Sequence, residues 1–377
     1  MYVRECSLRD FRSYETLSVA FPPGIGVLVG SNGQGKTNLV EALAYVATLS
    51  SHRVAGDAPL IRRGAESAAV RAVVSHEGRD IELEIELVPQ KSNRAKVNRS
   101  PVKKPRDILG YLNVVVFAPE DLTLVKGDPS DRRHFLDQTL IAMSPRLSAL
   151  RSDLDRVLKQ RNALLKTAQS AARANSAEVM RTLDVWDGQL AHISAELVTR
   201  RLHLVDALQP IAREMYAVVS DDRGPFGMHY EPSLEHVPTT DDVATWEAAY
   251  LDALAHRRKD EIDRGITLVG PHRDELHLEL RDLPVKGYAS HGESWSSALT
   301  LRLATFELLR RDRPGGDPVL ILDDVFAELD TRRRQRLIEI ARTAEQTLVT
   351  AAVAEDVPAE LAGARYDVHA GEVQRVL

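Results

Sequence analysis

Near the start of the chain, apolar and polar residues follow a period of two. The segments 2–8 and 17–21 are expected to be strands of this kind, and 25–29 is a short, mostly apolar run. Successive side chains of a strand point to opposite faces, so this pattern predicts strands of a sheet with one face in water. The alternation is strictest within 68–88, where glutamates separate the apolar residues Ile81, Leu83, Ile85 and Leu87.

Beyond Pro145 the apolar period lengthens to about three and a half residues. This period predicts long helices that pack in the manner of a coiled coil, with the stretch 167–177 as the bend between them. We therefore expect residues 129–262 to form an inserted helical arm. Its apolar series are Leu147, Leu150, Leu154, Leu158 and Leu165, followed by Leu183, Leu190, Leu197, Leu204 and Ile211.

The return from the arm has a different composition. Residues 219–245 are rich in Asp, Pro, Gly and Thr, which predicts a loop-dominated connection. A helix over 243–264 and a strand over 266–269 are expected to follow. The basic residues of the first arm helix are interpreted as its water-exposed face, with DNA contact as the alternative: Arg151, Arg156, Lys159, Arg161 and Lys166.

A phosphate-binding loop lies between the apolar run 25–29 and an amphipathic helix. Residues 30–37 fit the pattern G-x-x-x-x-G-K-[ST], in which glycines let backbone N–H groups approach phosphates at a helix N-terminus. We expect Lys36 to reach the β- and γ-phosphates and Thr37 to hold Mg²⁺. The predicted ATP-binding residues here are Gly30, Ser31, Asn32, Gly33, Gln34, Gly35, Lys36, Thr37 and Asn38.

Paired carboxylates lie almost at the other end of the chain. Asp323 and Asp324 end an apolar strand-like run, so Asp323 is expected to bind Mg²⁺ and Asp324 to orient or deprotonate the attacking water. With Lys36 they are the candidate catalytic residues. Their distance from the loop predicts an insertion into an α/β head composed of residues 1–128 and 263–377.

Composition limits the class of protein. The chain has 377 residues, 44% hydrophobic and 28% charged, without an apolar run long enough to span a membrane. Its start does not resemble a signal peptide, and the one cysteine, Cys6, forms no internal disulfide framework. We therefore expect a soluble cytoplasmic protein without a membrane partner.

The net charge is −6, so any contact with DNA must be local or assembled between subunits. The polar stretch 90–106 carries a cluster of basic residues. A solvated hairpin tip and a contact with the phosphate backbone are both open interpretations. The cluster is Lys91, Arg94, Lys96, Arg99, Lys103, Lys104 and Arg106.

A capped helix is predicted shortly before the acidic pair. Ser290 precedes an amphipathic helix over 295–309, and Glu293 stands at the capping-box position. Ser-x-Gly-Glu at a helix start also resembles the signature motif of ABC-type ATPases, which binds the γ-phosphate of ATP held by the opposite subunit. The resemblance assigns Ser290, Gly292 and Glu293 to this motif and Asp330 to the D-loop at the same interface.

Nearly the whole chain resembles the RecF family, whose ATPase head is similar to those of SMC proteins. The resemblance implies an ABC-type α/β head with a short arm, ATP and Mg²⁺ as cofactors, and ATP-dependent dimerisation. It places Arg53 near the phosphates, although a surface arginine is the alternative. The matching segments, in order, are 11–14, 33–38, 51–53, 117–122, 125–127, 132–137, 270–274 and 322–330.

The family's activity is also implied by the resemblance alone. It would be slow, DNA-dependent ATP hydrolysis on gapped or junction DNA. With RecR and RecO, the protein would load RecA onto single-stranded gaps and support replication restart and SOS induction. No role is predicted for the segment 270–274.

Two departures from ABC transporters affect the prediction. Thr350 is followed by two alanines, without a switch histidine, and Asp324 is one methylene shorter than glutamate. Thr350 could contribute only a hydroxyl, and the shorter side chain of Asp324 lengthens the reach to water, which favours slow hydrolysis. The alternatives are a transporter motor subunit and a scaffold that binds ATP without hydrolysing it.

Overall fold

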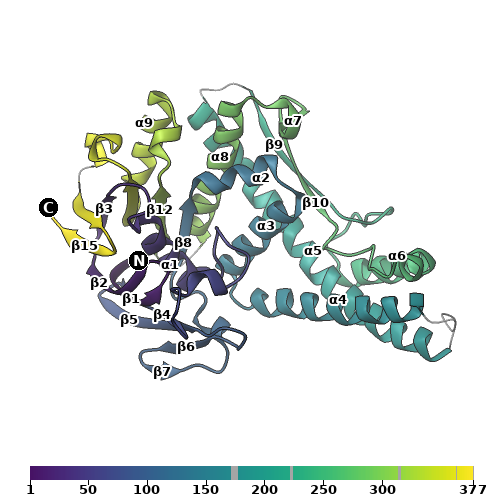
Figure 1. Ribbon diagram of the computed structural model, residues 1–377. Coiled ribbons are helices and arrows are strands. Elements are labelled where there is room, and N and C mark those ends of the chain that lie inside the picture. Colours follow the sequence, from purple (N-terminus) through teal and green to yellow (C-terminus); the bar gives the residue numbers. More distant parts are fainter. Residues whose placement is uncertain (171–176, 221–223, 313–315, 362, 377) are drawn as a thin grey trace. The chain divides into compact units, whose positions relative to one another are not determined.

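The computed structural model describes residues 1–170, 177–220, 224–312, 316–361 and 363–376 (Figure 1). The chain divides into two compact units. The head unit comprises Met1–Lys126, Ile211–Phe226 and Gly287–Leu377, and the arm unit comprises Gly127–Pro210 and Gly227–Lys286. Relative to the expected boundaries, residues 211–226 group with the head and residues 263–286 with the arm. The inserted arm as a separate functional domain stays a prediction.

The first sheet of the head unit is antiparallel and has the strand order β2-β1-β4-β5-β6-β7. The expected alternation is present, since Leu83, Ile85 and Leu87 are buried. Cys6 is fully buried in β1, as a small apolar residue would be. The strands are β1 Tyr2–Phe11, β2 Tyr14–Ala20, β4 Ala68–His76, β5 Arg79–Leu87, β6 Arg94–Val97 and β7 Ser100–Pro101.

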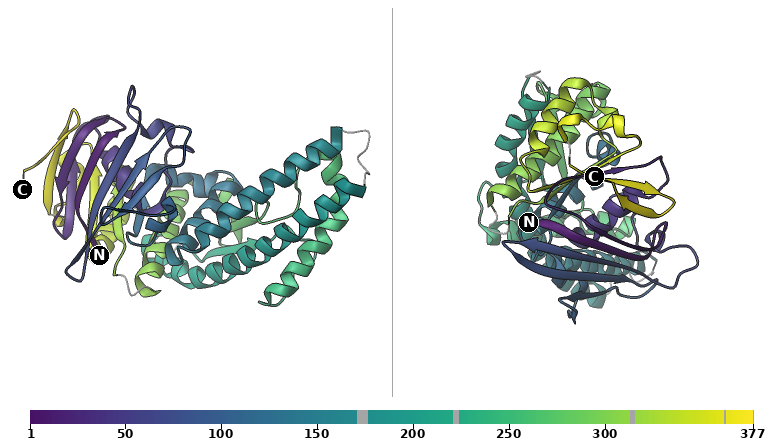
Figure 2. Two further views of the ribbon diagram at one scale, coloured as in Figure 1. Left: turned by 90° about the horizontal axis from the view of Figure 1, so that it is seen from below. Right: turned by 90° about the vertical axis from the view of Figure 1, so that its left-hand side faces the viewer.

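The second sheet has the order β15-β14-β3-β13-β12-β8 and is parallel except for the β14–β15 hairpin. Strands from both ends of the sequence lie side by side in it, as the purple and yellow ribbons of Figure 2 show. Parallel strands covered on both faces are buried along their whole length, as β12 and β13 are here, although β13 also carries the buried polar residues Gln346, Thr347 and Thr350. The strands are β3 Gly24–Val29, β8 Val114–Phe117, β12 Val319–Asp323, β13 Gln346–Ala351, β14 Ala364–His369 and β15 Glu372–Arg375.

Helix α1, Lys36–Thr48, packs against strands of both head sheets. Leu39, Val40 and Leu43 are completely buried there and join one hydrophobic core. Helix α8 packs against β8 and α2. The other helical segments are α2 Leu122–Lys126, α8 His291–Asp312, α9 Thr331–Ala341 and the short turns η1 Ala58–Leu60, η2 Pro105–Ile108, η3 Pro119–Asp121, η4 Phe326–Glu328, η5 Ala354–Asp356 and η6 Ala359–Leu361.

The arm unit consists of long helices and a three-stranded sheet of order β11-β10-β9. Helix α4 packs against α6, and the series from Leu183 to Ile211 is buried as predicted. Residues 171–176 of the predicted bend lie outside the described residues. The elements are α3 Pro129–Met143, α4 Leu147–Ser170, α5 Ala177–Ser220, α6 Val243–Arg264, α7 Val285–Tyr288, β9 Phe226–Glu231, β10 Glu275–Leu280 and β11 Leu283–Pro284.

Of two predictions about the return from the arm, the first is incomplete and the second is wrong, although loop makes up most of the described residues of 219–245. The segment 219–245 contains strand β9, in which Phe226, Met228 and Tyr230 alternate with more exposed residues. The second prediction, a strand at 266–269, is not met. Two backbone N–H groups of this segment donate to side chains and not to a neighbouring strand. The backbone N of Thr267 donates to Asn162, and that of Leu268 to Glu261.

The interpretation of Arg161 as part of a water-exposed face is also wrong. Its side chain is fully buried and donates to Asp187, Glu261 and the hydroxyl of Thr267. A buried guanidinium is tolerated because its donors are satisfied by carboxylates. In contrast, Arg156 on the same helix is exposed and pairs with Asp153, which is exposed as well.

None of the helices in the described ranges is both long and apolar enough to cross a membrane.

Candidate functional site

The phosphate loop runs from the end of β3 into α1 with the backbone shape that its glycines allow. Gly33 and Gly35 have positive φ angles of 84° and 117°. A side chain at Gly30 would lie 2.2 Å from the carbonyl oxygen of Val368 in β14, and one at Gly35 would lie 2.7 Å from the Tyr14 hydroxyl. Neighbouring strands therefore hold the loop in a conformation that only glycine permits at these positions.

Polar contacts fix the loop on several sides. The Lys36 Nζ donates to the Gly30 carbonyl oxygen at 2.6 Å, and its side chain is almost completely buried. The Tyr14 hydroxyl donates to the Gly35 carbonyl at 3.0 Å. The Gln34 side chain accepts a hydrogen bond from the backbone N of Ala370, in the turn between β14 and β15. The Lys36 ammonium is thus held against the first residues of the loop.

The predicted magnesium ligands converge from α1 and β12. The Thr37 hydroxyl donates to Asp323 Oδ1 at 3.0 Å, and the Thr350 hydroxyl donates to the same oxygen at 2.6 Å. Burial and the neighbouring Asp324 raise the pKa of Asp323. A bound cation would lower this pKa again, because it favours the charged carboxylate. A hydroxyl and one carboxylate beside a phosphate site suit Mg²⁺, which keeps several waters and nucleotide oxygens as ligands.

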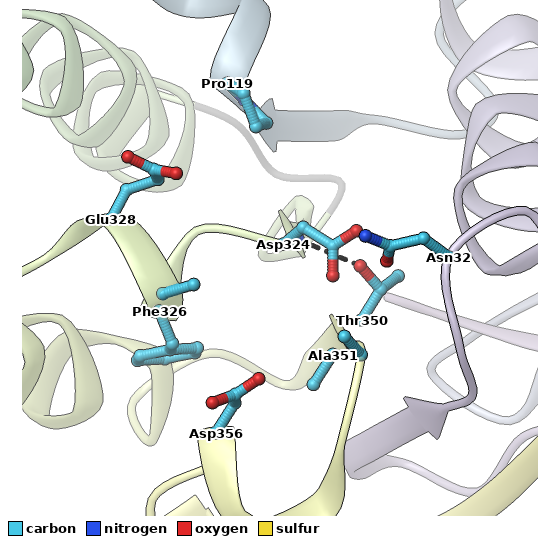
Figure 3. Close-up of a pocket in the computed structure, with 10 residues that line it drawn as sticks. Asn32, Pro119, Asp324, Phe326, Glu328, Thr350, Ala351 and Asp356 are labelled. Carbon is cyan, nitrogen blue, oxygen red and sulfur yellow. Dashed lines mark hydrogen bonds between the residues drawn. The ribbon is translucent and has the colours of Figure 1, made fainter.

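Asp324 follows β12 in a left-handed backbone conformation, with φ of 51°. Its backbone N donates to the Thr350 hydroxyl, so Thr350 connects both aspartates. Asp324 lines a cavity of about 180 Å³ together with Asn32, Thr350, Glu328 and other residues, and Figure 3 shows the carboxylate beside the Asn32 amide. This position is suited to a base that acts on water next to the phosphate loop.

Sequence reasoning missed a buried acid behind the loop. Glu41 on α1 is fully buried, and both of its oxygens accept from the Arg12 guanidinium at 2.6 and 2.9 Å. Burial alone would raise the pKa of Glu41, but the bonds from Arg12 and Ser51 lower it overall. The sequence feature that could have indicated this buried acid is the position of Glu41 on an otherwise apolar face of the helix.

Glu41 also positions Arg53. The Arg53 guanidinium lies 3.3 Å from Glu41 and donates to Asn38 at 3.0 Å. One third of its side chain is exposed, so Arg53 is held beside the first turn of α1 with part of its surface available. A contact between Arg53 and phosphate stays a prediction.

The segment predicted as the signature motif begins α8. The backbone N of Ser290 donates to Glu293 Oε2 at 2.9 Å, and the Glu293 N–H donates to the Ser290 hydroxyl at 3.3 Å. The predicted capping box is therefore confirmed. Within the described chain, Ser290 and Gly292 form no hydrogen bond with the phosphate loop, so this helix start is a separate element of the head.

Asp330, predicted in the D-loop, caps helix α9. Its carboxylate accepts from the backbone N of Arg333 at 2.9 Å. The residue itself is exposed.

The segment 270–274 has a clear structural place in the arm unit. Asp274 is buried and accepts from the Tyr230 hydroxyl and the backbone N of Ser233. Arg201 donates to the Pro271 carbonyl at 2.7 Å and to both oxygens of Asp137. The segment thus connects α3, α5 and β9 through buried polar contacts.

Comparisons with known proteins agree with this architecture. The chain matches the family model of the RecF/RecN/SMC N terminal domain over residues 2–363. It is similar in fold to the Smc head domain with an extended coiled coil from Pyrococcus furiosus, with a TM-score of 0.53 and 16% identity over 100% of this chain and 96% of that one. Fold and site together define a head of the ABC and SMC type of ATPase.

Two relatives of higher similarity indicate the family within this class of ATPase. A solved chain described as the recombination mediator protein RecF-ATP in the RecFOR pathway has a TM-score of 0.90 and 25% identity, over 100% of this chain and 98% of that one. The DNA replication and repair protein RecF of Frankia alni is 56% identical over 378 residues, which cover 100% of both chains. The chain belongs to the RecF family.

Proposed function

We propose that the protein is an ATP-dependent DNA clamp of recombinational repair. One observation carries the proposal: the head brings the predicted phosphate loop together with Asp323 and Asp324 and has, as a separate element, the exposed start of α8. Family membership supports the same function, and a solved relative is described with ATP and as a recombination mediator. The transporter alternative is set aside, because the chain belongs to a different family.

The first half of the proposed site binds the nucleotide. N–H groups of the loop 30–37 and Lys36 hold the phosphates, and Thr37 and Asp323 hold Mg²⁺. The metal would neutralise charge that develops on the phosphate oxygens. Asp324 orients the attacking water and accepts its proton. The burial of Asp323 excludes bulk water from that side of the site.

The second half acts on ATP held by another copy of the chain. The first N–H groups of a helix have no partner within the helix, and its N-terminus carries partial positive charge. Gly292 at the start of α8 would present its N–H group to the γ-phosphate of the partner's ATP, and Ser290 would exchange its bonds to Glu293 for bonds to the same phosphate. Asp330 would cross the same interface. ATP therefore closes a dimer, and hydrolysis opens it.

The cellular role follows from the family. The dimer would form on gapped or junction DNA and, with RecR and RecO, promote RecA loading onto single-stranded gaps. Replication restart and SOS induction would depend on this step. ATP hydrolysis, stimulated by DNA, would act as a timer. A turnover above about 10 s⁻¹, the median for enzymes, would contradict the timer function.

Size measurement in solution, with and without ATP and DNA, tests the composite site. The wild type should dimerise with ATP, Lys36→Met should lose both ATP binding and the dimer, and Ser290→Arg should bind ATP but stay monomeric. Ser152→Arg, at an exposed position of α4, is the matched control and should dimerise normally. An ATP-bound dimer of Ser290→Arg would contradict the proposal.

Asp324→Asn separates a clamp from a scaffold. If hydrolysis opens the dimer, this variant should accumulate ATP-bound dimers on DNA, because the amide cannot accept the proton from water. Unchanged dimer lifetimes would show that hydrolysis has no part in the cycle and would favour the scaffold.

A further inference from the structure

Helix α9 begins with a run of arginines, and one of them bridges two elements of the head. Arg333 lies in the first turn of α9, directly after the D-loop, and only 13% of its side chain is exposed. Its Nη1 donates to Asp330 Oδ2 at 2.7 Å, while the backbone N of the same residue donates to Oδ1. Asp330 therefore caps α9 and fixes the direction of the Arg333 side chain.

The other end of the guanidinium reaches helix α8. Its Nε donates to the Ser296 hydroxyl at 2.8 Å, and Ser296 is completely buried, about one turn beyond the start of α8. A charged donor bonded to a buried hydroxyl in this way is stronger than a neutral pair. The bond thus ties the D-loop to the body of α8.

Gly292 lets the guanidinium lie against the start of α8. A Cβ atom on Gly292 would come within 3.2 Å of Arg333 Nη2 and 3.3 Å of Nη1. The cation is consequently packed against the backbone of the residue that the proposed function assigns to the partner's γ-phosphate. A positive charge beside a helix N-terminus also favours an anion there.

We propose that Arg333 is a positioning residue that holds the D-loop and the start of α8 as one rigid surface for the partner's ATP. The inference rests on the proposed function. Arg333 acts through Asp330, Ser296 and Gly292, and the assembled surface meets the second copy with both elements already in place. Preorganisation of this kind lowers the cost of ordering that association would otherwise carry.

The variants Arg333→Met, Arg333→Lys and Ser296→Ala test this coupling. Dimerisation is followed by sedimentation with ATP, and ATP binding to the monomer by fluorescence of a labelled ATP analogue. Arg333→Met should raise the dimer dissociation constant by at least about tenfold and leave ATP binding by the monomer unchanged, since a charge-assisted bond is lost outside the phosphate loop. Arg333→Lys, which keeps one bond and the charge, should recover part of this loss.

Arg336→Met is the matched control. Arg336 lies on the same helix, is 45% exposed and pairs with the exposed Glu339, so its loss should not alter dimerisation. If Arg333→Met fails to fold, Ser296→Ala tests the same coupling, because it removes only the hydroxyl that accepts from Arg333. This variant should also raise the dimer dissociation constant. A monomeric wild type would overturn the proposed function itself. A dimerising wild type with equally stable Arg333→Met or Ser296→Ala dimers would overturn the role of Arg333 alone.

Discussion

At the residue scale, two hydroxyls share one carboxylate oxygen in the candidate site. Thr37 and Thr350 both donate to Asp323 Oδ1, and the second hydroxyl also accepts from the backbone N of Asp324. The strand therefore ends in a threonine, with no histidine at the position of the switch histidine of ABC transporters. The hydroxyl of this threonine is hydrogen-bonded to both aspartates. The sequence indicated only that Thr350 offers a hydroxyl.

Thr350→Val should slow ATP hydrolysis more than it weakens nucleotide binding. The valine cannot orient Asp323 or accept from Asp324, so we expect turnover to fall about tenfold or more and the free energy of unfolding to fall by about 1–3 kcal/mol. Single-turnover hydrolysis and urea unfolding measure the two effects. Thr347 lies on the same strand as Thr350, and its buried hydroxyl donates to the Ala341 carbonyl of α9, so Thr347→Val should lower stability only. Equal turnover in both variants would contradict the role of Thr350.

His272 should make the arm unit sensitive to acid. Burial, assisted by nearby arginines, lowers the pKa of His272 from 6.5 to about 4. Between pH 6.5 and 4, His272 is therefore protonated in the unfolded chain and neutral in the folded chain. The free energy of unfolding falls as the pH drops from 6.5 towards 4, by about 3 kcal/mol in total.

Urea unfolding at pH 7 and pH 4.5 measures this effect. In His272→Gln the loss of stability between the two pH values should be clearly smaller than in the wild type. The exposed His256→Gln is the control and should retain the wild-type difference. An unchanged pH dependence in His272→Gln would show that another group is responsible.

At the scale of elements, the local patterns were sufficient for the phosphate loop, its flanking strand and helix, and the capped start of α8. Each of these depends on residues close together in sequence. The failures depended on distant partners. The buried position of Arg161 requires Asp187 and Glu261, and the backbone at 266–269 is irregular because Asn162 and Glu261 bind it.

The same contacts predict which arginine stabilises the arm unit. Arg161→Met leaves the buried Glu261 without its cation, whereas Asp187 keeps its ion pair with Arg258, and the change should lower the free energy of unfolding by about 3–5 kcal/mol. Arg156→Met removes only an exposed pair and should change it by less than about 1 kcal/mol. Thermal and urea unfolding of the two variants give the comparison. A similar cost for both would mean that the buried network contributes little.

At the scale of the whole molecule, a net charge of −6 requires that DNA contact be local. The basic side chains of the hairpin β6–β7 and its flanks form two groups that differ in their ion pairs. Arg94, Lys96 and Arg99 pair with glutamates of β5, whereas Lys103 and Lys104 are exposed and have no ion pair within the described ranges. The second group is the better candidate for contact with phosphates.

Lys103→Ala with Lys104→Ala should weaken DNA binding and reduce its salt dependence. If both side chains contact phosphates, the slope of log affinity against log salt should fall by about two, since each contact contributes about 0.9. Arg94→Ala with Lys96→Ala should change the slope less. Gel shifts across a salt series measure both, and an unchanged slope for the first pair would remove this hairpin from the DNA interface.

The strand order of the parallel sheet has a consequence for biosynthesis. Strand β3, which leads into the phosphate loop, is bonded on both sides to β13 and β14, from the far end of the sequence. A nascent chain that has not yet reached residue 346 therefore carries an apolar strand with two open edges, a template for aggregation. The strand that leads into the phosphate loop therefore gains both of its neighbours only after residues 346–369 have been synthesised.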